Sequence, residues 1–335
     1  MSGSMIRQGL CLAALLLAGA AGPACAELLK DPQWQAWLDA GKSAELERAA
    51  QQRFNAQPDD VQAAVALALA ALDGGEARRL EAVSKPLQAC VERQPAQALC
   101  HYALGSVQGV QAMNASMFKA LGLAGSVKEN LQRAVELDPM LYEARQALVQ
   151  FYLMAPGVAG GSVSKARELA AAAEKRQPEQ ARLLRANIAA QDKQWAEMER
   201  ELQAVRPGDN RSLQNDLRDS WAQLGTQLMA DKQMAKARGV FEQLLREYPA
   251  QAIGAYGLGR VATEQGQADE AVKLFERART LDGADRLPID HRLGIALLAK
   301  GEKQQARQAL ERFVANKRAN PRNLEDAKKR LAELG

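Results

Sequence analysis

The chain has 335 residues, of which 47% are hydrophobic and only 4% aromatic. Ala, Leu, Gln, Glu, Arg and Lys dominate, which favours an all-α protein whose helices pack through small side chains. The 44 basic and 40 acidic residues give a net charge of +4 and are scattered without long blocks, so the sequence lacks a concentrated phosphate-binding surface and argues against nucleic acid as a partner.

Residues 1–26 differ from the rest of the chain and are predicted to be a signal peptide. Arg7 supplies a positive charge, residues 10–22 form an apolar stretch, and Ala24-Cys25-Ala26 fits a cleavage site with small residues. The apolar stretch is too short to span a bilayer comfortably, and polar sequence follows it. We expect Sec-type export, cleavage after Ala26, a periplasmic location and no transmembrane segment in the mature protein.

Cys25 leaves a second interpretation open, in which a lipid is attached to this cysteine after cleavage just before it. The preceding Gly22-Pro23-Ala24 is a poor match to a bacterial lipobox, where an aliphatic residue normally lies three positions before the cysteine. We therefore favour a soluble exported protein over a lipid-anchored one.

Removal of the leader takes away Cys11 and Cys25 and leaves Cys90 and Cys100. An even pair in an oxidising compartment predicts a disulfide. The intervening sequence is typical of a helix end, a turn with proline and a new helix start, and such a hairpin can bring two Cα atoms within the roughly 4.4–6.8 Å that a bridge requires. The alternative is a pair of small buried thiols at a helix contact.

Residues 27–215 are predicted to form helical hairpins in which small residues and prolines recur at irregular spacing, with Trp34 and Trp37 packing an N-terminal helix onto the first hairpin. Two irregular loops interrupt this pattern. Residues 106–126 carry four large apolar side chains, for which we favour a core position over an exposed docking patch: Met113, Met117, Phe118 and Leu121. Residues 155–162 (APGVAGGS) form either a tolerated insertion or a loop that reaches a partner.

In residues 216–320 the spacing becomes regular. Leu224-Gly225 recurs as Leu258-Gly259, Ala237 as Ala271 and Phe241 as Phe275, with a fixed period that is typical of a solenoid. A third unit repeats the pattern with one extra residue in the spacing, through Leu293-Gly294, Ala306, Leu310 and Phe313. Trp221 opens the first of these units. Residues 321–335 are predicted to form a capping helix with a polar outer face, because no neighbour would cover it.

These residue types have a packing role. Gly or Ala on the first helix of a pair allows the second helix to approach closely, and the Phe fills the remaining gap. Glycine within a helix costs about 1 kcal/mol relative to alanine, so a packing reason is needed to keep it. The pattern resembles the tetratricopeptide repeat. This resemblance implies a right-handed α-solenoid of stacked antiparallel helix pairs, and we count six or seven pairs.

The repeat also explains a string that resembles a dinucleotide-binding loop. Gly257, Gly259 and Ala262 have the spacing of such a loop, but no β-branched strand precedes them, so no cofactor is expected. The two histidines, His101 and His291, lie far apart in sequence, and none of the common metal-binding or nucleophile motifs is present. We therefore predict a protein that is not an enzyme, with no catalytic residues and no metal.

In stacked helix pairs the first helices line a concave face. The predicted partner-binding residues on this face are Asp219, Thr226, Met229, Ile253, Tyr256, Arg260 and Glu264. An alternative is that the groove holds the protein's own N-terminal helix. Our hypothesis is an exported scaffold that binds a protein or peptide partner in envelope assembly, secretion or polysaccharide export. The competing hypothesis is an enzyme, or an enzyme-associated module, that uses residues 106–126 and 155–162 as a substrate site.

Overall fold

The computed structural model describes residues 28–316 and 319–334, and the predicted signal peptide with Cys25 lies outside this range. The described residues form seventeen α-helices, two short 3₁₀ helices and no strand. The helices are α1 (Pro32–Asp39), α2 (Ser43–Ala56), α3 (Val61–Gly74), α4 (Ala77–Arg93), α5 (Ala98–Met113), α6 (Met117–Leu137), α7 (Tyr142–Met154), α8 (Val163–Ala173), α9 (Pro178–Gln191), α10 (Trp195–Ala204), α11 (Arg211–Ala230), α12 (Met234–Glu247), α13 (Ala252–Glu264), α14 (Ala268–Arg279), α15 (Ile289–Ala299), α16 (Lys303–Ala315) and α17 (Pro321–Glu333).

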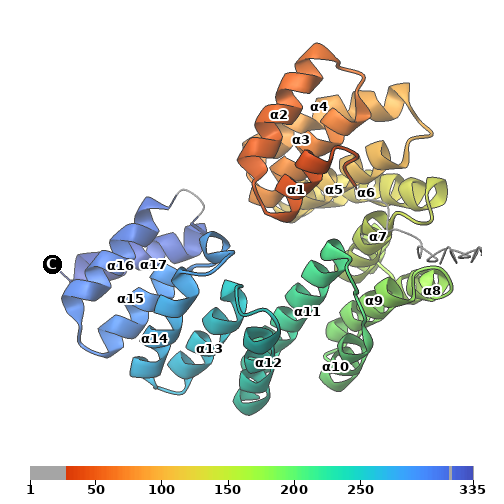
Figure 1. The fold of residues 1–335 in the computed structure, drawn as a ribbon. Helices are drawn as coiled ribbons and strands as arrows, with labels where there is room; N and C mark the ends of the chain where they lie inside the picture. The colour runs from red at the N-terminus through yellow and green to blue at the C-terminus, as the bar shows by residue number, and fades with distance from the viewer. Residues whose placement is uncertain (1–27, 317–318, 335) are drawn as a thin grey trace, which may run out of the picture.

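Consecutive helices pack in pairs, and the pairs stack along a curved array that ends in the single helix α17 (Figure 1). The prediction of an all-α solenoid is therefore confirmed. The described chain contains eight pairs, more than we expected, because residues 32–56 form a pair, α1 and α2, where the sequence suggested one N-terminal helix. Trp34 is buried in this region, and Trp37 packs against the same core.

In most turns between paired helices, one residue has a positive φ angle. Gly266 (φ 72°) and Gly301 (φ 80°) follow α13 and α15 in this conformation. Lys232 (φ 61°) takes the same place after α11, and Lys193 (φ 54°) takes it after α9. Glycine adopts this region without steric cost, whereas a lysine there is uncommon. The turn geometry is thus kept even where the sequence pattern has lost its glycine.

The regular units pack through glycines on their first helices. A β-carbon at Gly225 would lie 2.7 Å from the ring of Phe241, and one at Gly259 would lie 2.6 Å from the ring of Phe275. In the third unit, Leu310 occupies the space above Gly294. The remaining residues of the repeat pattern are buried as well: Trp221, Leu224, Ala237, Leu258, Ala271, Leu293 and Ala306.

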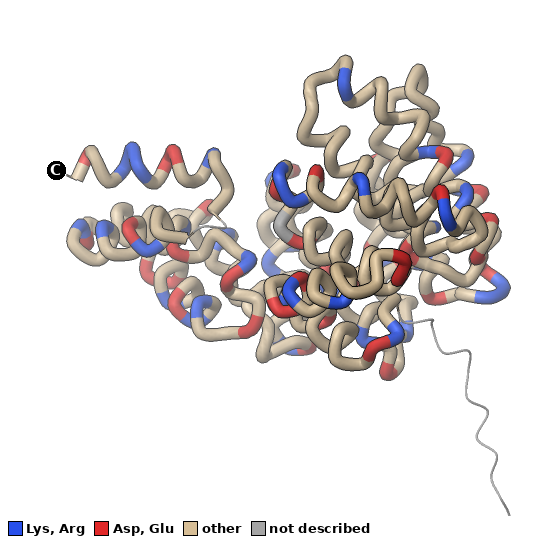
Figure 2. The backbone as a smooth tube through the Cα atoms, turned by 90° about the horizontal axis from the view of Figure 1, so that it is seen from above, with Lys and Arg blue, Asp and Glu red and all other residues tan. Residues whose placement is uncertain are grey.

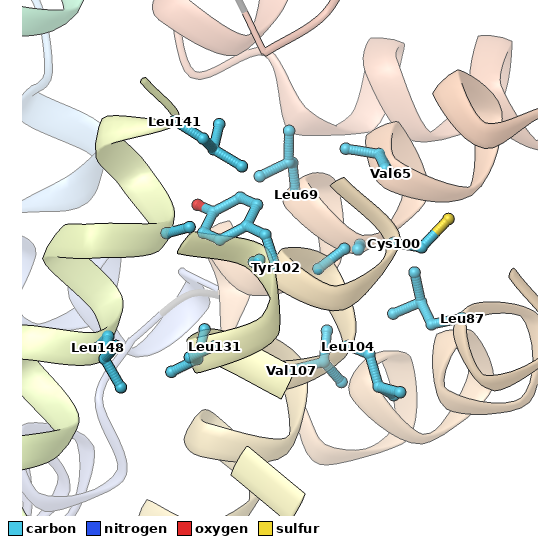
Figure 3. Packing of buried hydrophobic residues seen from close by; sticks show 14 of the residues in the cluster. Val65, Leu69, Leu87, Cys100, Tyr102, Leu104, Val107, Leu131, Leu141 and Leu148 are labelled. Carbon is cyan, nitrogen blue, oxygen red and sulfur yellow. The ribbon is translucent and has the colours of Figure 1, made fainter. Parts of the chain in front are cut away.

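The irregular N-terminal units share one core despite their weaker pattern. Figure 3 shows how α3, α4, α5, α6 and α7 contribute to it through side chains that include Leu69, Leu87, Leu104, Leu131 and Leu148. Each pair covers an apolar face of the next, so the core continues along the array. The structure joins Cys90 of α4 to Cys100 of α5 by a disulfide, with a Cα–Cα distance of 5.7 Å.

The two predicted irregular loops have different structures. Residues 106–126 are not a loop, since they comprise the end of α5, a short turn and the start of α6. The favoured core position of their apolar side chains is also wrong, because Met113, Met117, Phe118 and Leu121 are exposed, Phe118 by 88%. Residues 155–162 do form a loop, which contains the 3₁₀ helix η1 (Gly157–Ala159) and contacts α6.

No helix within the described ranges is long and apolar enough to cross a membrane. Acidic and basic residues are interspersed along the described backbone, without a large region of one sign (Figure 2). This distribution agrees with the scattered charge in the sequence.

Candidate functional site

A cavity of about 930 Å³ lies on the inner side of the array, where its walls come from four helices that are far apart in sequence. The walls are formed by α1, the first turns of α7 and α9, and the first half of α11. First helices of successive pairs thus meet the N-terminal helix around one open space. α1, the first helix of the described chain, forms one wall of this cavity.

Two carboxyl groups in this cavity have strongly altered acidity. Burial raises the pKa of Glu143 on α7 to about 7, and the negative charge of Asp138 adds to the effect. Burial likewise raises the pKa of Asp216 on α11 to about 7, helped by repulsion from Glu143 and Asp219 and opposed by Arg218. Both groups line the cavity, so two carboxyl groups lie there in surroundings that favour their protonated, neutral form.

A third titratable group lies next to this pair. Figure 3 shows Tyr102 reaching from α5 toward the start of α7, near Leu141. Burial, together with the charges of Glu143 and Asp216, raises the pKa of Tyr102. Its hydroxyl is therefore neutral at physiological pH and adds no further negative charge beside the two acids.

Arg286 lines the cavity and comes from the C-terminal part of the array. It ends the 3₁₀ helix η2 (Ala284–Arg286), between α14 and α15, and its Nη2 donates to Asp73 Oδ1 of α3 at 3.0 Å. Asp73 also accepts a hydrogen bond from Ser43 of α2. The guanidinium packs so closely on Gly41 that a β-carbon there would overlap it. The first three helices and the C-terminal units therefore meet across the inner side of the curve (Figure 1).

Comparisons with known proteins identify the repeat. Two family models described as tetratricopeptide repeat match residues 223–286 and residues 291–316. This is a tetratricopeptide repeat protein. A comparison with curated protein sequences gives no significant match.

Solved structures with a similar fold are also tetratricopeptide repeat solenoids. Yeast Tom70 is 12% identical over 88% of this chain and 60% of its own, with a TM-score of 0.61. A chain of the APC/C hetero-tetramer Cut9–Hcn1 is 14% identical over 90% of this chain and 54% of its own, with a TM-score of 0.47. This tetratricopeptide repeat protein thus spans little more than half the length of either structure. At such identities the likeness to Tom70 shows the fold alone.

The predicted partner-binding residues of this tetratricopeptide repeat protein fall into two groups. Asp219 and Glu264 are exposed, and Thr226, Ile253 and Arg260 are partly exposed. Met229 and Tyr256 are each only 6% exposed, which corrects the expectation that they offer contact surface. Of the seven residues, only Asp219 lines the cavity.

The partly exposed residues form a small linked group. Arg260 on α13 donates to Thr226 Oγ1 on α11 at 3.2 Å, and its guanidinium lies 5.8 Å from the ring centroid of Tyr256. Tyr256 in turn packs against Phe275. The Tyr256 ring therefore packs against the Arg260 guanidinium, and the hydrogen bond to Thr226 joins the first helices of two successive repeats.

The histidines have structural environments. His101 lies between Asn130 and the carbonyl of Pro95, at 2.9 and 3.1 Å. Burial lowers the pKa of His291, whose Nε2 lies 2.7 Å from Asp326 of the capping helix. Among the residues that the structure describes, no group of three His, Cys, Asp or Glu side chains could hold a metal ion. Tetratricopeptide repeat proteins are in general non-catalytic scaffolds.

Sequence reasoning missed Glu143 and Asp216. Each is an ordinary acidic residue on the first helix of its own pair, and no local motif marks it. A partial signal exists, because both lie on first helices, which line the inner face of a solenoid. Their common cavity follows from the curvature of the whole array, which the residue pattern of a single repeat does not encode.

Proposed function

We propose that this protein is an exported, non-enzymatic scaffold that holds a protein or peptide partner during cell-envelope assembly, secretion or polysaccharide export. Residues 1–26 support export to the periplasm because they have the pattern of a cleaved signal peptide. The disulfide between Cys90 and Cys100 is consistent with an oxidising compartment. The tetratricopeptide fold suggests a protein-interaction role.

The observation that carries this proposal is the inner face of the array. First helices from successive pairs surround one cavity and continue into the group of Arg260 and Thr226. Such a surface is elongated and combines polar and apolar positions, as a groove for an extended or helical segment would. Tetratricopeptide repeat proteins are in general non-catalytic scaffolds, which supports the scaffold over the enzyme hypothesis.

Affinity capture from envelope extracts tests the proposal. The wild-type protein is compared with the double variant Arg260→Ala/Glu264→Ala, which alters the first helix of a regular unit at accessible positions. The control is Glu242→Ala/Lys273→Ala, which also removes one acid and one base but from exposed positions on the second helices α12 and α14. We expect wild type and control to recover the same partner and the groove variant to recover at least about fivefold less, since interface substitutions of about 1 kcal/mol have this effect.

Three results would contradict parts of this proposal. Equal capture by all three proteins would place the binding surface elsewhere. Failure of the wild-type protein to retain any partner, even after cross-linking in the envelope, would oppose the scaffold function. The intact mass of the exported protein should correspond to a chain that begins at Glu27. A mass that includes a lipid on Cys25 would instead indicate a membrane-anchored protein.

A further inference from the structure

The cavity on the inner face carries an excess of negative charge. Five carboxyl groups line it, against three guanidinium groups: Asp39, Glu143, Asp209, Asp216 and Asp219 against Arg211, Arg218 and Arg286. Arg218 pairs with Asp219 of the same cavity at 2.9 Å, and Arg286 pairs with Asp73 outside it. No described lysine or arginine forms an ion pair with Glu143 or Asp216. Glu143 and Asp216 therefore have no ion-pair partner among the described residues, although the charge of Arg218 lowers the pKa of Asp216 slightly.

We propose that this cavity binds a lysine or arginine side chain of a partner polypeptide through Glu143 and Asp216. The inference rests on the proposed scaffold function and deepens it by naming the chemistry of the partner. A buried carboxylate is costly unless a cation or hydrogen-bond donor pairs with it. An ammonium or guanidinium group would meet this need through charge-assisted hydrogen bonds, which are about twice as strong as neutral ones.

The size and composition of the cavity fit an organic cation better than a metal ion. At about 930 Å³ the space falls within the range of roughly 300–1,000 Å³ that is usual for sites of small organic groups. The described residues offer no set of three metal ligands. Leu38 and Ala36 of α1 and Leu213 of α11 also line the walls, and such apolar side chains suit the methylene stem of a lysine or arginine.

The surrounding charges give the site a pH dependence. Glu143 and Asp216 face Tyr102 of α5, Asp138 before α7, and Arg218 and Asp219 of α11. Asp39 of α1, Asp209, Arg211 and Arg286 complete the charged groups around the cavity. Because the pKa of each acid is raised to about 7, both are largely ionised at pH 8 and largely protonated at pH 5.5. A cationic side chain should therefore bind more tightly at pH 8.

Fluorescence anisotropy with labelled peptides tests the proposal on the mature protein. The probes are acetylated and amidated peptides with four repeats of Gly-Ser-Lys, and matched peptides with Gln or Glu in place of Lys. At low salt and pH 8 we expect the Lys peptide to bind at least tenfold more tightly than the Gln peptide. Its affinity should fall at least tenfold at pH 5.5, as the two carboxylates take up protons.

The variant Glu143→Gln/Asp216→Asn should lose this binding. Its control is Glu129→Gln/Glu311→Gln, which removes the same charge from exposed positions on α6 and α16 and should bind as wild type does. The cavity variant should remain folded. An acid whose pKa is raised in the folded state makes the protein less stable as the pH rises from about 4 through 7, because the folded state then loses its proton less readily than the unfolded state. The amide side chains of the cavity variant do not ionise, so they avoid this loss of stability. Its midpoint of thermal unfolding at pH 8 should therefore equal or exceed that of wild type.

Several outcomes would overturn the proposal. Equal binding of the Lys peptide by the cavity variant would assign the attraction to another surface, and absence of Lys binding by wild type would remove the site. Binding of spermidine without binding of the Lys peptide would indicate a small-molecule site instead. If the cavity variant still captures the wild-type partner from envelope extracts, the scaffold function stands and the cavity proposal fails.

Discussion

At the residue scale, glycine decides how closely the two helices of a repeat approach. Gly257 lies on α13 with its Cα toward Phe241 of the preceding unit, and a β-carbon there would come within 2.1 Å of the ring. Gly259, two residues later, faces Phe275 of its own unit in the same way. These glycines thus serve two different contacts, one between repeats and one within a repeat. Helix packing therefore explains why the glycines of this helical segment have the spacing of a dinucleotide-binding loop.

The substitution Gly257→Ala should destabilise the protein although alanine is the better helix former. The gain in helix propensity is about 1 kcal/mol, whereas forcing a methyl group into a packed core typically costs about 1–3 kcal/mol, and here the fully buried Phe241 ring would have to move. Urea unfolding followed by circular dichroism should show a lower midpoint.

Gly239 provides a matched control for that measurement. It lies in the middle of α12, is exposed, and has no atom near the position of an added β-carbon. Gly239→Ala should therefore raise stability by up to about 1 kcal/mol. The packing account would be wrong if both substitutions shifted the midpoint in the same direction.

At the scale of the secondary-structure elements, the repeat pattern in the sequence did not predict the lengths of the helices. Residues 106–126 look like an insertion in the repeat, yet they extend α5 and α6 by whole turns. Gly122 and Gly125 lie within α6 at exposed positions, and nothing lies within 4 Å of an added β-carbon at either. The extension carries Met117 and Phe118 beyond the neighbouring pairs, which explains their exposure. Helix propensity over this stretch outweighed the loss of repeat spacing.

The disulfide between α4 and α5 acts at this scale, since it joins adjacent helix pairs where the repeat pattern is weak. A bridge that closes a short loop should contribute roughly 2–3 kcal/mol to stability. Addition of dithiothreitol should therefore lower the urea midpoint of wild type and increase hydrogen exchange in α4 and α5. The variant Cys90→Ala/Cys100→Ala should have the urea midpoint of reduced wild type, and dithiothreitol should not change this midpoint. Detection of two free thiols in the exported protein by mass spectrometry would defeat this prediction.

At the scale of the whole molecule, a solenoid has few contacts between distant repeats, so each one affects its overall curvature. Repeats normally touch only their neighbours. Here Arg286 joins the C-terminal units to α3 and packs on Gly41. An exposed ion pair of this kind is worth at most about 1 kcal/mol and is weakened by salt. It should therefore bias the curvature of the array without locking it.

Substitution of this residue should open the array. We expect Arg286→Ala to increase the radius of gyration measured by small-angle X-ray scattering, and high salt to move the wild-type protein in the same direction. Arg277→Ala removes an exposed arginine from α14 and should leave the radius unchanged. If Arg286→Ala and Arg277→Ala gave the same scattering curve at low salt, Arg286 would have no part in setting the curvature.

Much of the fold could be predicted from the sequence because it depends on local rules. The recurrence of Leu-Gly, Ala and Phe indicated helix pairs, since only small residues allow close helix contact. The pattern also placed Gly225 and Gly259 at helix contacts, where the structure has them. Predictions for the inner face were weaker. Tyr256 and Met229 lie on first helices as expected but are covered by their neighbours.

The sequence by itself determined the all-α architecture, the repeat and the order of its elements, because each of these follows from side chains within about two helices of one another. The tertiary structure alone decided which distant residues meet. Glu143, Asp216 and α1 surround one cavity, and Arg286 reaches Asp73, only because small rotations between successive pairs add up over the array. The total rotation depends on every interface between helix pairs along the chain, so it cannot be predicted from any single segment of the sequence.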